Sequence, residues 1–468
     1  MSTGEAASRS CGMPLHTGAV DHRGIDNQDG KQQIIMEASV EYRSGGKSRV
    51  AAAAPWIGTV AAGGILSAMT APGQTAGLSV FTDPLIANLG VSRTEISVSY
   101  LIGTLVGAAA LPFVGRALDR YSIRVVTAVI GVVFASFLLV LSLAGDILGL
   151  TAGFVGVRMA GQGALSLAAT TVVARTITHR RGLALGITTA VGSGGISLAP
   201  VFLASMIPDF GIERVWRLEA LVVLCVVIPI ALLLPRGQRV TTVSSTGSHS
   251  EYDVDSWTLA EARRTGMFWI ISAGLAATGL LSTALAFHQI SILGAQGLSP
   301  IEAAANFLPQ TLTGIAATLA AGALSDRIPP KYFVTFSMVT MAAALVFIPT
   351  ITPGWTALIY GLVLGAAGGS IRGIEAAAFA RYFGTRHIGS IRGVATAINL
   401  ASTAAGPLVL SIGRDLSGGY HVPVVCLAFV PLGVGVMAFF GRAPSRDLRR
   451  SRRRDDATGG LTLPTRWP

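Results

Sequence analysis

An arginine stands in the middle of an apolar stretch of the chain. Arg158 lies about ten residues into the run Leu148–Ala174, within the letters GVRMAGQGA. If that run is a helix crossing a bilayer, a rise of about 1.5 Å per residue puts the guanidinium near mid-depth. A buried cation without a partner is strongly disfavoured, and a guanidinium can hold a carboxylate through two parallel hydrogen bonds. We therefore expect Arg158 to bind a small carboxylate. The alternative is an arginine that braces its own helix through backbone carbonyls or Gln162.

Other polar side chains also lie in apolar runs, and each is a candidate for substrate binding because polar groups are costly inside a membrane. Gln74 and Thr75 belong to the letters PGQT, which predict a local break that exposes backbone groups. His288 can titrate near neutral pH, and Gln310 and Asn399 can add hydrogen bonds. The alternative for each is a structural role, and for His288 a hydrogen-bonded packing role is the stronger reading.

Two opposite charges lie three residues apart in a later apolar run. Arg372 and Glu375 have the spacing that brings side chains together on one face of a helix. Because they lie near the inner end of that run, we predict a structural or gating ion pair. This pairing would use the carboxylate and leave Arg158 as a cation without an acidic partner.

The sequence shows no arrangement typical of an enzyme. It has no cluster of His, Asp and Ser, and its three cysteines are too widely scattered for a metal site or an obvious disulfide. A phosphate-binding loop pattern is absent, which argues against ATP-driven transport by this chain. We expect no metal and no cofactor. An intramembrane enzyme stays open as an alternative, and it would require a hydroxyl nucleophile and an inert Arg158.

Long apolar runs must position these residues. Of 468 residues, 51% are hydrophobic and only 13% are charged, which a soluble domain seldom shows. Runs of roughly 20 apolar residues, the length that crosses a bilayer as a helix, recur twelve times. The expected spans are Ile57–Phe81, Ile96–Phe113, Val125–Leu143, Leu148–Ala174, Leu183–Ile207, Leu218–Leu234, Trp269–Leu293, Ala303–Leu324, Tyr332–Thr350, Trp355–Phe379, Gly393–Ile412 and Pro423–Phe440. The sequence predicts an all-α, multi-pass membrane protein.

The distribution of basic residues orients the spans. With a cytosolic N-terminus, the inside loops hold about fifteen Lys and Arg and the outside loops four. We therefore expect both termini in the cytosol and the protein in the plasma (inner) membrane. The net charge of +11 includes a basic tail starting at Arg446, which suits orientation or lipid headgroups better than nucleic acid.

The chain contains an internal duplication with an offset of 207 residues. Ser92 and Glu95 recur as Ser299 and Glu302, and both pairs form the Ser-x-x-Glu capping box of a helix start. The repeat implies two similar halves. The expected parts are a disordered cytosolic extension at 1–54, a six-helix bundle at 55–235, a cytosolic linker at 236–265, a second six-helix bundle at 266–442 and a basic cytosolic tail at 443–468.

The loops after the second and eighth runs carry a recognisable motif. G-x-L-x-D-R-x-G-R-K is approximated at Gly115, Leu118, Asp119, Arg120 and Arg124, and again at Gly322, Leu324, Asp326, Arg327 and Lys331. This duplicated motif resembles that of the major facilitator superfamily over roughly residues 55–442. The resemblance implies twelve transmembrane helices in two six-helix bundles, a mid-membrane site between the halves, and transport by alternating access.

A second motif narrows the resemblance. Before the fifth run, Arg180, Arg181, Leu183, Ala184 and Gly186 match R-R-x-L-A-x-G, and the chain looks like the monocarboxylate porter and oxalate/formate antiporter branch. This implies mono- or dicarboxylate substrates carried by symport or antiport. The eighth run lacks the Asp/Arg pair of proton-coupled members, which argues against a proton/lactate mechanism. Protons stay one candidate for the coupling ion.

The resemblance also implies a gate. In the family, the loop carboxylate meets the start of helix eleven and holds the cytosolic side closed, and the contact breaks when the protein faces inward. This assigns gating roles to Asp119, Arg120, Asp326 and Arg327, against a role in topology and stability alone. The alternative functions are efflux of amphipathic drug-like compounds and a membrane sensor without transport. We expect the chain to work as a monomer in the bilayer, and its substrate, direction and coupling ion stay open.

Overall fold

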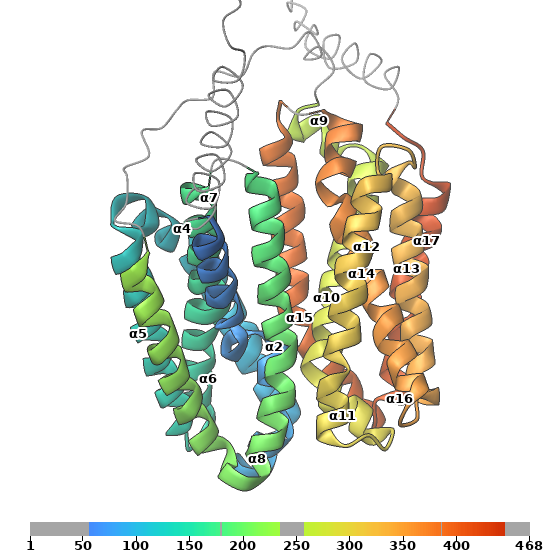
Figure 1. Cartoon of the computed structure of the whole chain (residues 1–468). Helices are drawn as coiled ribbons and strands as arrows, with labels where there is room; N and C mark the ends of the chain where they lie inside the picture. Colours follow the sequence, from blue (N-terminus) through green and yellow to red (C-terminus); the bar gives the residue numbers. More distant parts are fainter. Residues whose placement is uncertain (1–55, 178–179, 235–256, 385, 445–468) are drawn as a thin grey trace, which may run out of the picture. The chain divides into compact units, whose positions relative to one another are not determined.

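Every regular element of the described chain is helical (Figure 1). The computed structural model describes residues 56–177, 180–234, 257–384 and 386–444. The expected extension at 1–54, most of the linker at 236–265 and nearly all of the basic tail at 443–468 lie outside these residues. The expected all-α class is therefore confirmed for the part of the chain that the structure describes.

The first half begins with a broken helix. Residues 56–68 are helical, and the chain then passes through a 3-10 turn before the short helix α2 completes the first expected span. The short helix α3 follows directly after it. The elements of this half are η1 (Ala71–Gly73), α2 (Thr75–Ser79), α3 (Thr82–Leu89), α4 (Arg93–Arg120), α5 (Ile123–Ser142), α6 (Ile147–Val157), η2 (Arg158–Leu165), α7 (Ser166–Thr176) and α8 (Arg181–Leu233). The break predicted from the letters PGQT is confirmed.

The second half contains longer uninterrupted helices. Its elements are α9 (Leu259–Arg263), α10 (Gly266–Ala295), α11 (Pro300–Ala305), α12 (Phe307–Leu324), α13 (Pro330–Phe347), η4 (Ile348–Thr350), α14 (Trp355–Phe383), α15 (Ile388–Ser417), α16 (His421–Leu427) and α17 (Phe429–Phe440). The short α9 is docked at the end of α14, where the backbone N–H of Trp257 donates to the carbonyl of Phe383 at 2.8 Å.

Nine helical segments of the described chain are long and apolar enough to cross a membrane. One of them, α8, covers two expected spans because Gly211, at φ 73°, joins two helices across a kink. The first and fourth expected spans do not qualify as single helices because each is divided into shorter pieces. All twelve expected spans are thus helical within the described residues.

Capping explains why the repeated helices begin where they do. The Ser92 hydroxyl accepts from the Glu95 N–H while the Glu95 carboxylate accepts from the Ser92 N–H, and Ser299 and Glu302 repeat both bonds. Each box satisfies free amides at a helix start. The capping boxes predicted from the 207-residue offset are therefore confirmed.

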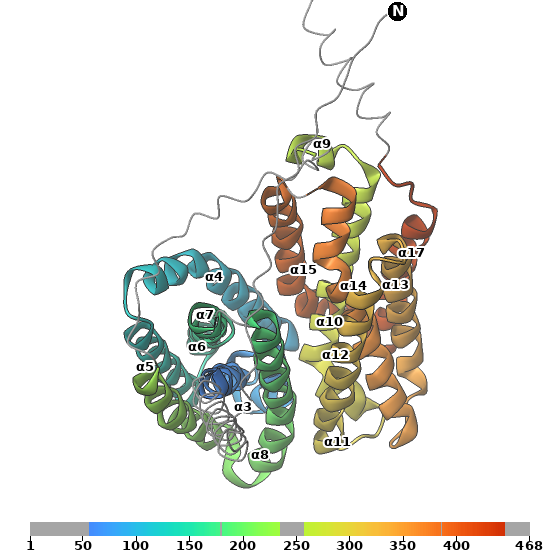
Figure 2. The ribbon, with the colours of Figure 1, turned by 45° about the horizontal axis from the view of Figure 1, so that its top comes forward.

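Packing within each half positions the polar residues. In the first half α4 packs on α6 and α5 on α8, and in the second α12 packs on α14 and α10 on α15. The continuous stack of α6, η2 and α7 lies inside a ring that includes α4, α5 and α8 (Figure 2). The halves meet where α4 touches α15, α10 touches α2, and α8 touches α11 and α12.

Candidate substrate site and gate contacts

Arg158 begins a segment of π-helix, η2, within the fourth expected span. Such wide turns are often found at functional sites because they displace a side chain from the regular helical register. The broken first helix lies directly against this segment. A Cβ on Gly73 would lie 2.4 Å from the carbonyl oxygen of Val157, so a glycine is required for this close approach. The break therefore brings backbone carbonyls to the arginine.

The Arg158 side chain is 2% exposed and is surrounded by neutral acceptors. Its Nε donates to the Thr104 hydroxyl at 3.1 Å, and Nη1 donates to the Gly73 carbonyl at 3.2 Å and the Thr75 hydroxyl at 3.4 Å. The guanidinium carbon lies 4.3 Å from the centre of the Tyr100 ring, whose hydroxyl is 2.7 Å from that of Thr75. The structure thus brings Thr75 and Arg158 together, as the sequence suggested.

One guanidinium nitrogen of Arg158 makes no hydrogen bond. Nη2 is buried and has no hydrogen-bond partner, and no carboxylate of the described residues forms an ion pair with this side chain. The bracing alternative is realised in part, because a backbone carbonyl is a partner. Gln162 is not a partner, and its own Oε1 is also buried without one. The site therefore has an unused donor and an uncompensated positive charge.

Gln74 lies near this site but does not bond to Arg158. Its Nε2 donates to the Thr70 hydroxyl at 3.0 Å, and its extended backbone precedes the first turn of α2. Gln74 thus shapes the break in the first helix.

His288 belongs to a different cluster. It is fully buried, and its Nε2 lies 3.0 Å from the Pro407 carbonyl and 3.2 Å from the Ser411 hydroxyl. Its Nδ1 lies 3.4 Å from the Tyr420 hydroxyl. None of these partners contacts Arg158, and the arrangement agrees with the packing role that the sequence favoured for this histidine.

Gln310 lies in an amide network inside the second half. Its Nε2 donates to Gln289 Oε1 at 2.8 Å and to Asn306 Oδ1 at 3.0 Å. Asn399, on α15, has a buried Oδ1 without a partner and lies against Gly279 of α10, where a Cβ would come within 2.2 Å of that oxygen. The structure does not bring either residue into contact with Arg158.

The predicted pair of Arg372 and Glu375 is wrong. Glu375 accepts from Arg392 of α15 at 3.1 Å, because α14 and α15 pack together and present the two groups to each other. Arg372 is exposed and lies beside Gly314 of α12. It forms no ion pair with a described residue, so the second half also contains a guanidinium without an acid.

The repeated loops share one contact with the main chain. Arg175 donates to the Leu118 carbonyl at 2.8 Å, and Arg381 donates to the Ser325 carbonyl at 2.9 Å. The two acceptors are related by the 207-residue offset. In each half this bond ties the loop to the end of a neighbouring helix.

The gating residues of these loops differ between the halves. Asp119 forms an ion pair with Arg175 of its own half and has no described bond to the start of α15. Arg120 lies 5.9 Å from the ring of Tyr121, and Asp326 and Arg327 are exposed and form no ion pair with described residues. The family contact is expected to break when the protein faces inward, so the gate stays a prediction.

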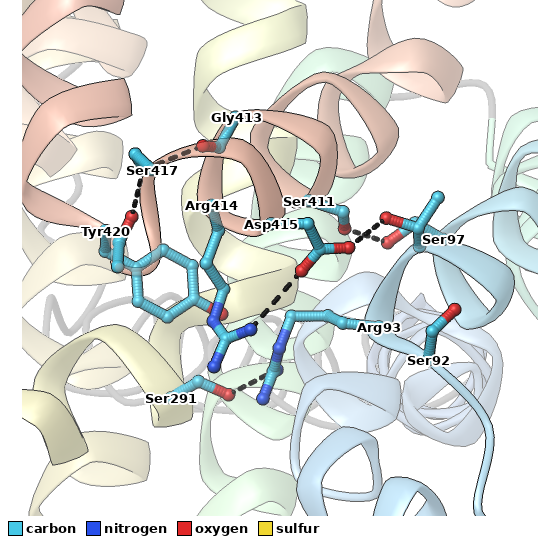
Figure 3. A network of polar contacts seen from close by, with 12 residues as sticks. Ser92, Arg93, Ser97, Ser291, Ser411, Gly413, Arg414, Asp415, Ser417 and Tyr420 are labelled. Atoms are coloured by element: carbon cyan, nitrogen blue, oxygen red, sulfur yellow. Dashed lines mark hydrogen bonds and ion pairs between the residues drawn. The ribbon is translucent and has the colours of Figure 1, made fainter.

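A network of polar contacts that sequence reasoning missed joins the halves (Figure 3). It lies towards the end of the bundle that includes α11 and α16, away from the repeated loops (Figure 1). Arg93 of α4 donates to Asp83 of α3 at 2.5 Å and to the Ser291 hydroxyl of α10 at 2.7 Å. Ser291 in turn donates to Asp83 at 2.7 and 2.8 Å. One serine of the second half is thus held by a full ion pair of the first half.

Two more bonds cross the halves beside it. The Thr94 hydroxyl donates to the Asp415 carboxylate at 2.6 Å, and the hydroxyls of Ser97 and Ser411 are 2.5 Å apart. We call these bonds, together with those of Asp83, Arg93 and Ser291, the outer contact, because the basic loops predict that this end faces away from the cytosol. The only sequence signal was a pair of opposite charges flanking a short loop, which does not reveal a partner on α10.

These features define a multi-pass integral membrane protein built from two helical halves, with one buried guanidinium, that of Arg158, which has no acidic partner among the described residues. The sequence profile of the Major Facilitator Superfamily matches residues 64–407, and the chain belongs to this family of transporters. Its fold is the one expected from the sequence.

Solved structures support the fold. A bacterial homolog of the human lysosomal transporter Spinster, inward-facing and unoccupied, is 17% identical with a TM-score of 0.62, over 81% of this chain and 95% of that one. The same type of protein in an inward-facing, occupied conformation is 16% identical with a TM-score of 0.60 and the same coverage. Among curated proteins, no sequence matches the chain significantly.

Proposed function

We propose that this transporter carries small organic anions, mono- or dicarboxylates, by alternating access as a secondary transporter. The observation that carries the proposal is Arg158, a buried guanidinium with only neutral acceptors and a free Nη2. A carboxylate bound there would neutralise the charge and accept from the unused donor. Charged hydrogen bonds of this kind are among the strongest in proteins.

The surroundings of Arg158 suit a ligand that binds and leaves. Thr75 and Tyr100 share one hydrogen bond, and both hydroxyls can turn to donate to an incoming carboxylate. The Gly73 carbonyl and Thr104 hold the guanidinium in place meanwhile. Because no protein carboxylate has to be displaced, the ligand does not compete with an internal salt bridge.

Arg372 supports the same substrate charge. Its expected partner Glu375 bonds to Arg392, so the second half adds another cation without an acid. An excess of positive charge in the spans favours anionic substrates over cationic ones. We propose the monocarboxylate and oxalate/formate branch as the nearest functional relatives, with the motif at Arg180 and Arg181 as support.

The polar contacts support an inward-facing state. The side-chain bonds between described residues of the two halves lie in the outer contact and between Ser197 of α8 and Thr311, in the second turn of α12. With the orientation predicted from the basic loops, this end faces outward in the plasma membrane. The structure would then be closed on the outside, as the solved relatives are in their inward-facing forms.

Substrate binding by purified protein tests the proposal. A panel of mono- and dicarboxylates is titrated against wild type, Arg158→Lys, Arg158→Gln and the control Arg217→Gln, an outer arginine paired within its own helix with Glu213. We expect weak binding for Lys, which keeps the charge but loses the planar fork, and almost none for Gln. The control should bind normally, and all variants should keep the wild-type melting temperature.

Two results would reject the proposal. Unchanged affinity in Arg158→Gln would remove the anion role and favour efflux of neutral or cationic amphipathic compounds. Lost binding with a collapsed melting temperature would show that Arg158 holds the fourth span. A separate assay measures uptake of the bound carboxylate into vesicles with and without a pH gradient. Protons are identified as the coupling ion if the carboxylate accumulates only when the gradient is present.

A further inference from the structure

A pocket of about 490 Å³ lies beside the outer contact. Its charged lining consists of Asp83, Arg93 and Arg414, so two guanidinium groups face a single carboxylate. Its volume lies within the range of small-molecule sites. The residues that line the pocket, at the boundary between the two halves, thus include one more cation than acid, and Asp415, the partner of Arg414, lies outside this lining.

Both arginines lie beside the same aromatic ring. The guanidinium carbons of Arg93 and Arg414 are 5.9 and 5.5 Å from the centre of the Tyr420 ring, which also lines the pocket. Burial raises the pKa of Tyr420 to about 12, so its phenol stays neutral and adds no negative charge. A flat ring beside two cations gives an anion an apolar wall as well as donors.

Donors of both arginines remain unused. Arg93 is 9% exposed, and its Nε is buried without a partner. Arg414 has one ion-pair contact, from Nη1 to Asp415 at 3.3 Å, and Asp415 also accepts from Thr94. The pocket can therefore accept an anion without breaking the fold of either half.

We propose that this pocket is a second anion site, in which a small carboxylate binds Arg414 and Arg93 and replaces Asp83 as the partner of Arg93. Ser291 is held by both members of the ion pair, so this exchange weakens the bond between the halves. Substrate at the outer face would thus loosen the contact that closes its own path. The proposal rests on the proposed anion transport, but it concerns residues that do not touch Arg158.

A labelling experiment on purified protein in detergent tests the site, with lactate and oxalate as probes. Ala295 lines the pocket and is exposed, so Ala295→Cys in a background without Cys11, Cys225 and Cys426 reports occupancy through its reaction with a maleimide. We expect at least one probe to slow labelling, and chloride at equal ionic strength to have no such effect. Equal protection by chloride would reduce the effect to screening and overturn the proposal.

Variants in the same background decide which site is reported. The measured quantity is the concentration of lactate or oxalate that halves the labelling rate. Arg414→Gln should raise this concentration at least tenfold, and Arg217→Gln should leave it unchanged. Asp83→Asn should lower it several-fold, because the competing carboxylate is gone while the side-chain shape remains. This opposite sign separates a binding site from general damage to the fold.

The variant Arg158→Gln distinguishes the proposed outer pocket from the proposed central site at Arg158. Unchanged protection in this variant supports an independent outer pocket, whatever happens to binding at the central site. Protection that is lost in Arg158→Gln but indifferent to Arg414→Gln and Asp83→Asn would show that the label senses the central site, and the outer pocket would be rejected. The outer pocket is also rejected if neither lactate nor oxalate slows labelling of Ala295→Cys in the cysteine-free background without further substitutions.

Discussion

Replacing Ser291 by alanine should shift the protein towards an outward-open state without unfolding it. The serine hydroxyl accepts from Arg93 and donates to Asp83, and these are bonds between the halves. The ion pair itself lies wholly within the first half and survives the substitution. The change therefore removes a tie between the halves and little else.

The size of the shift follows from the bonds that are lost. A hydrogen bond to a charged group contributes about 1.5–3 kcal/mol when it is buried. Asp83 has a side-chain exposure of 44%, and solvent weakens its share. We therefore expect a net loss of about 1–2 kcal/mol, which corresponds to roughly a 5- to 30-fold change in the ratio of the two states.

Spin-label distances measure this ratio. Labels at Ala87 and Pro353, on outer segments of the two halves, should show a larger population of long distances in Ser291→Ala than in wild type. The control Ser205→Ala removes a hydroxyl that bonds only to the Phe202 carbonyl of its own helix. An unchanged distance distribution in Ser291→Ala, or an equal shift in the control, would refute the outer contact as a gate.

Three further predictions address orientation, the inner loop and packing. With an impermeant maleimide on whole cells, a cysteine at Ala87 should be labelled and one at Ser390 should not; the reverse pattern would invert the topology. Asp119→Asn should slow initial uptake several-fold at equal protein amounts, with little effect on melting because its pair with Arg175 is largely exposed, and normal uptake would limit the loop to a role in topology. Gly365→Ala should destabilise the protein by about 1–3 kcal/mol or more, since its Cβ would lie 2.1 Å from the Thr313 hydroxyl oxygen. Gly186→Ala, with open space around it, should melt like wild type, and equal melting of both variants would contradict the packing described for α12 and α14.

Features that depend on neighbours in sequence were the ones that could be predicted. The apolar spans, the break in the first helix and the paired capping boxes all rest on local periodicity or short motifs. The π-helical segment within the fourth span was not foreseen, because a π-helix has no strong local signature in RMAGQGAL.

Contacts between helices could not be predicted in the same way. Spacing alone suggested that Arg372 meets Glu375, yet helix rotation turns Glu375 towards Arg392 on the next helix. No local pattern around Asp83 indicates its partners, but tertiary packing brings it to Arg93 and to Ser291, the latter 208 residues away. Of the candidate substrate residues, Thr75 adjoins Arg158, whereas Gln74, His288, Gln310 and Asn399 have other partners or none.

The bonds from Arg175 and Arg381 to main-chain carbonyls bear on how the two halves could diverge after duplication. A carbonyl oxygen is present whichever side chain its residue has, so Leu118 in one half and Ser325 in the other serve equally as acceptors. An ion pair lacks this tolerance, and the bond from Arg175 to Asp119 has no counterpart between Arg381 and Asp326. A bond that dates from before the duplication can thus persist in both halves, because substitution of the acceptor residue's side chain leaves its carbonyl oxygen in place. Comparing arginine-to-backbone bonds would trace such duplications after side-chain identity has been lost.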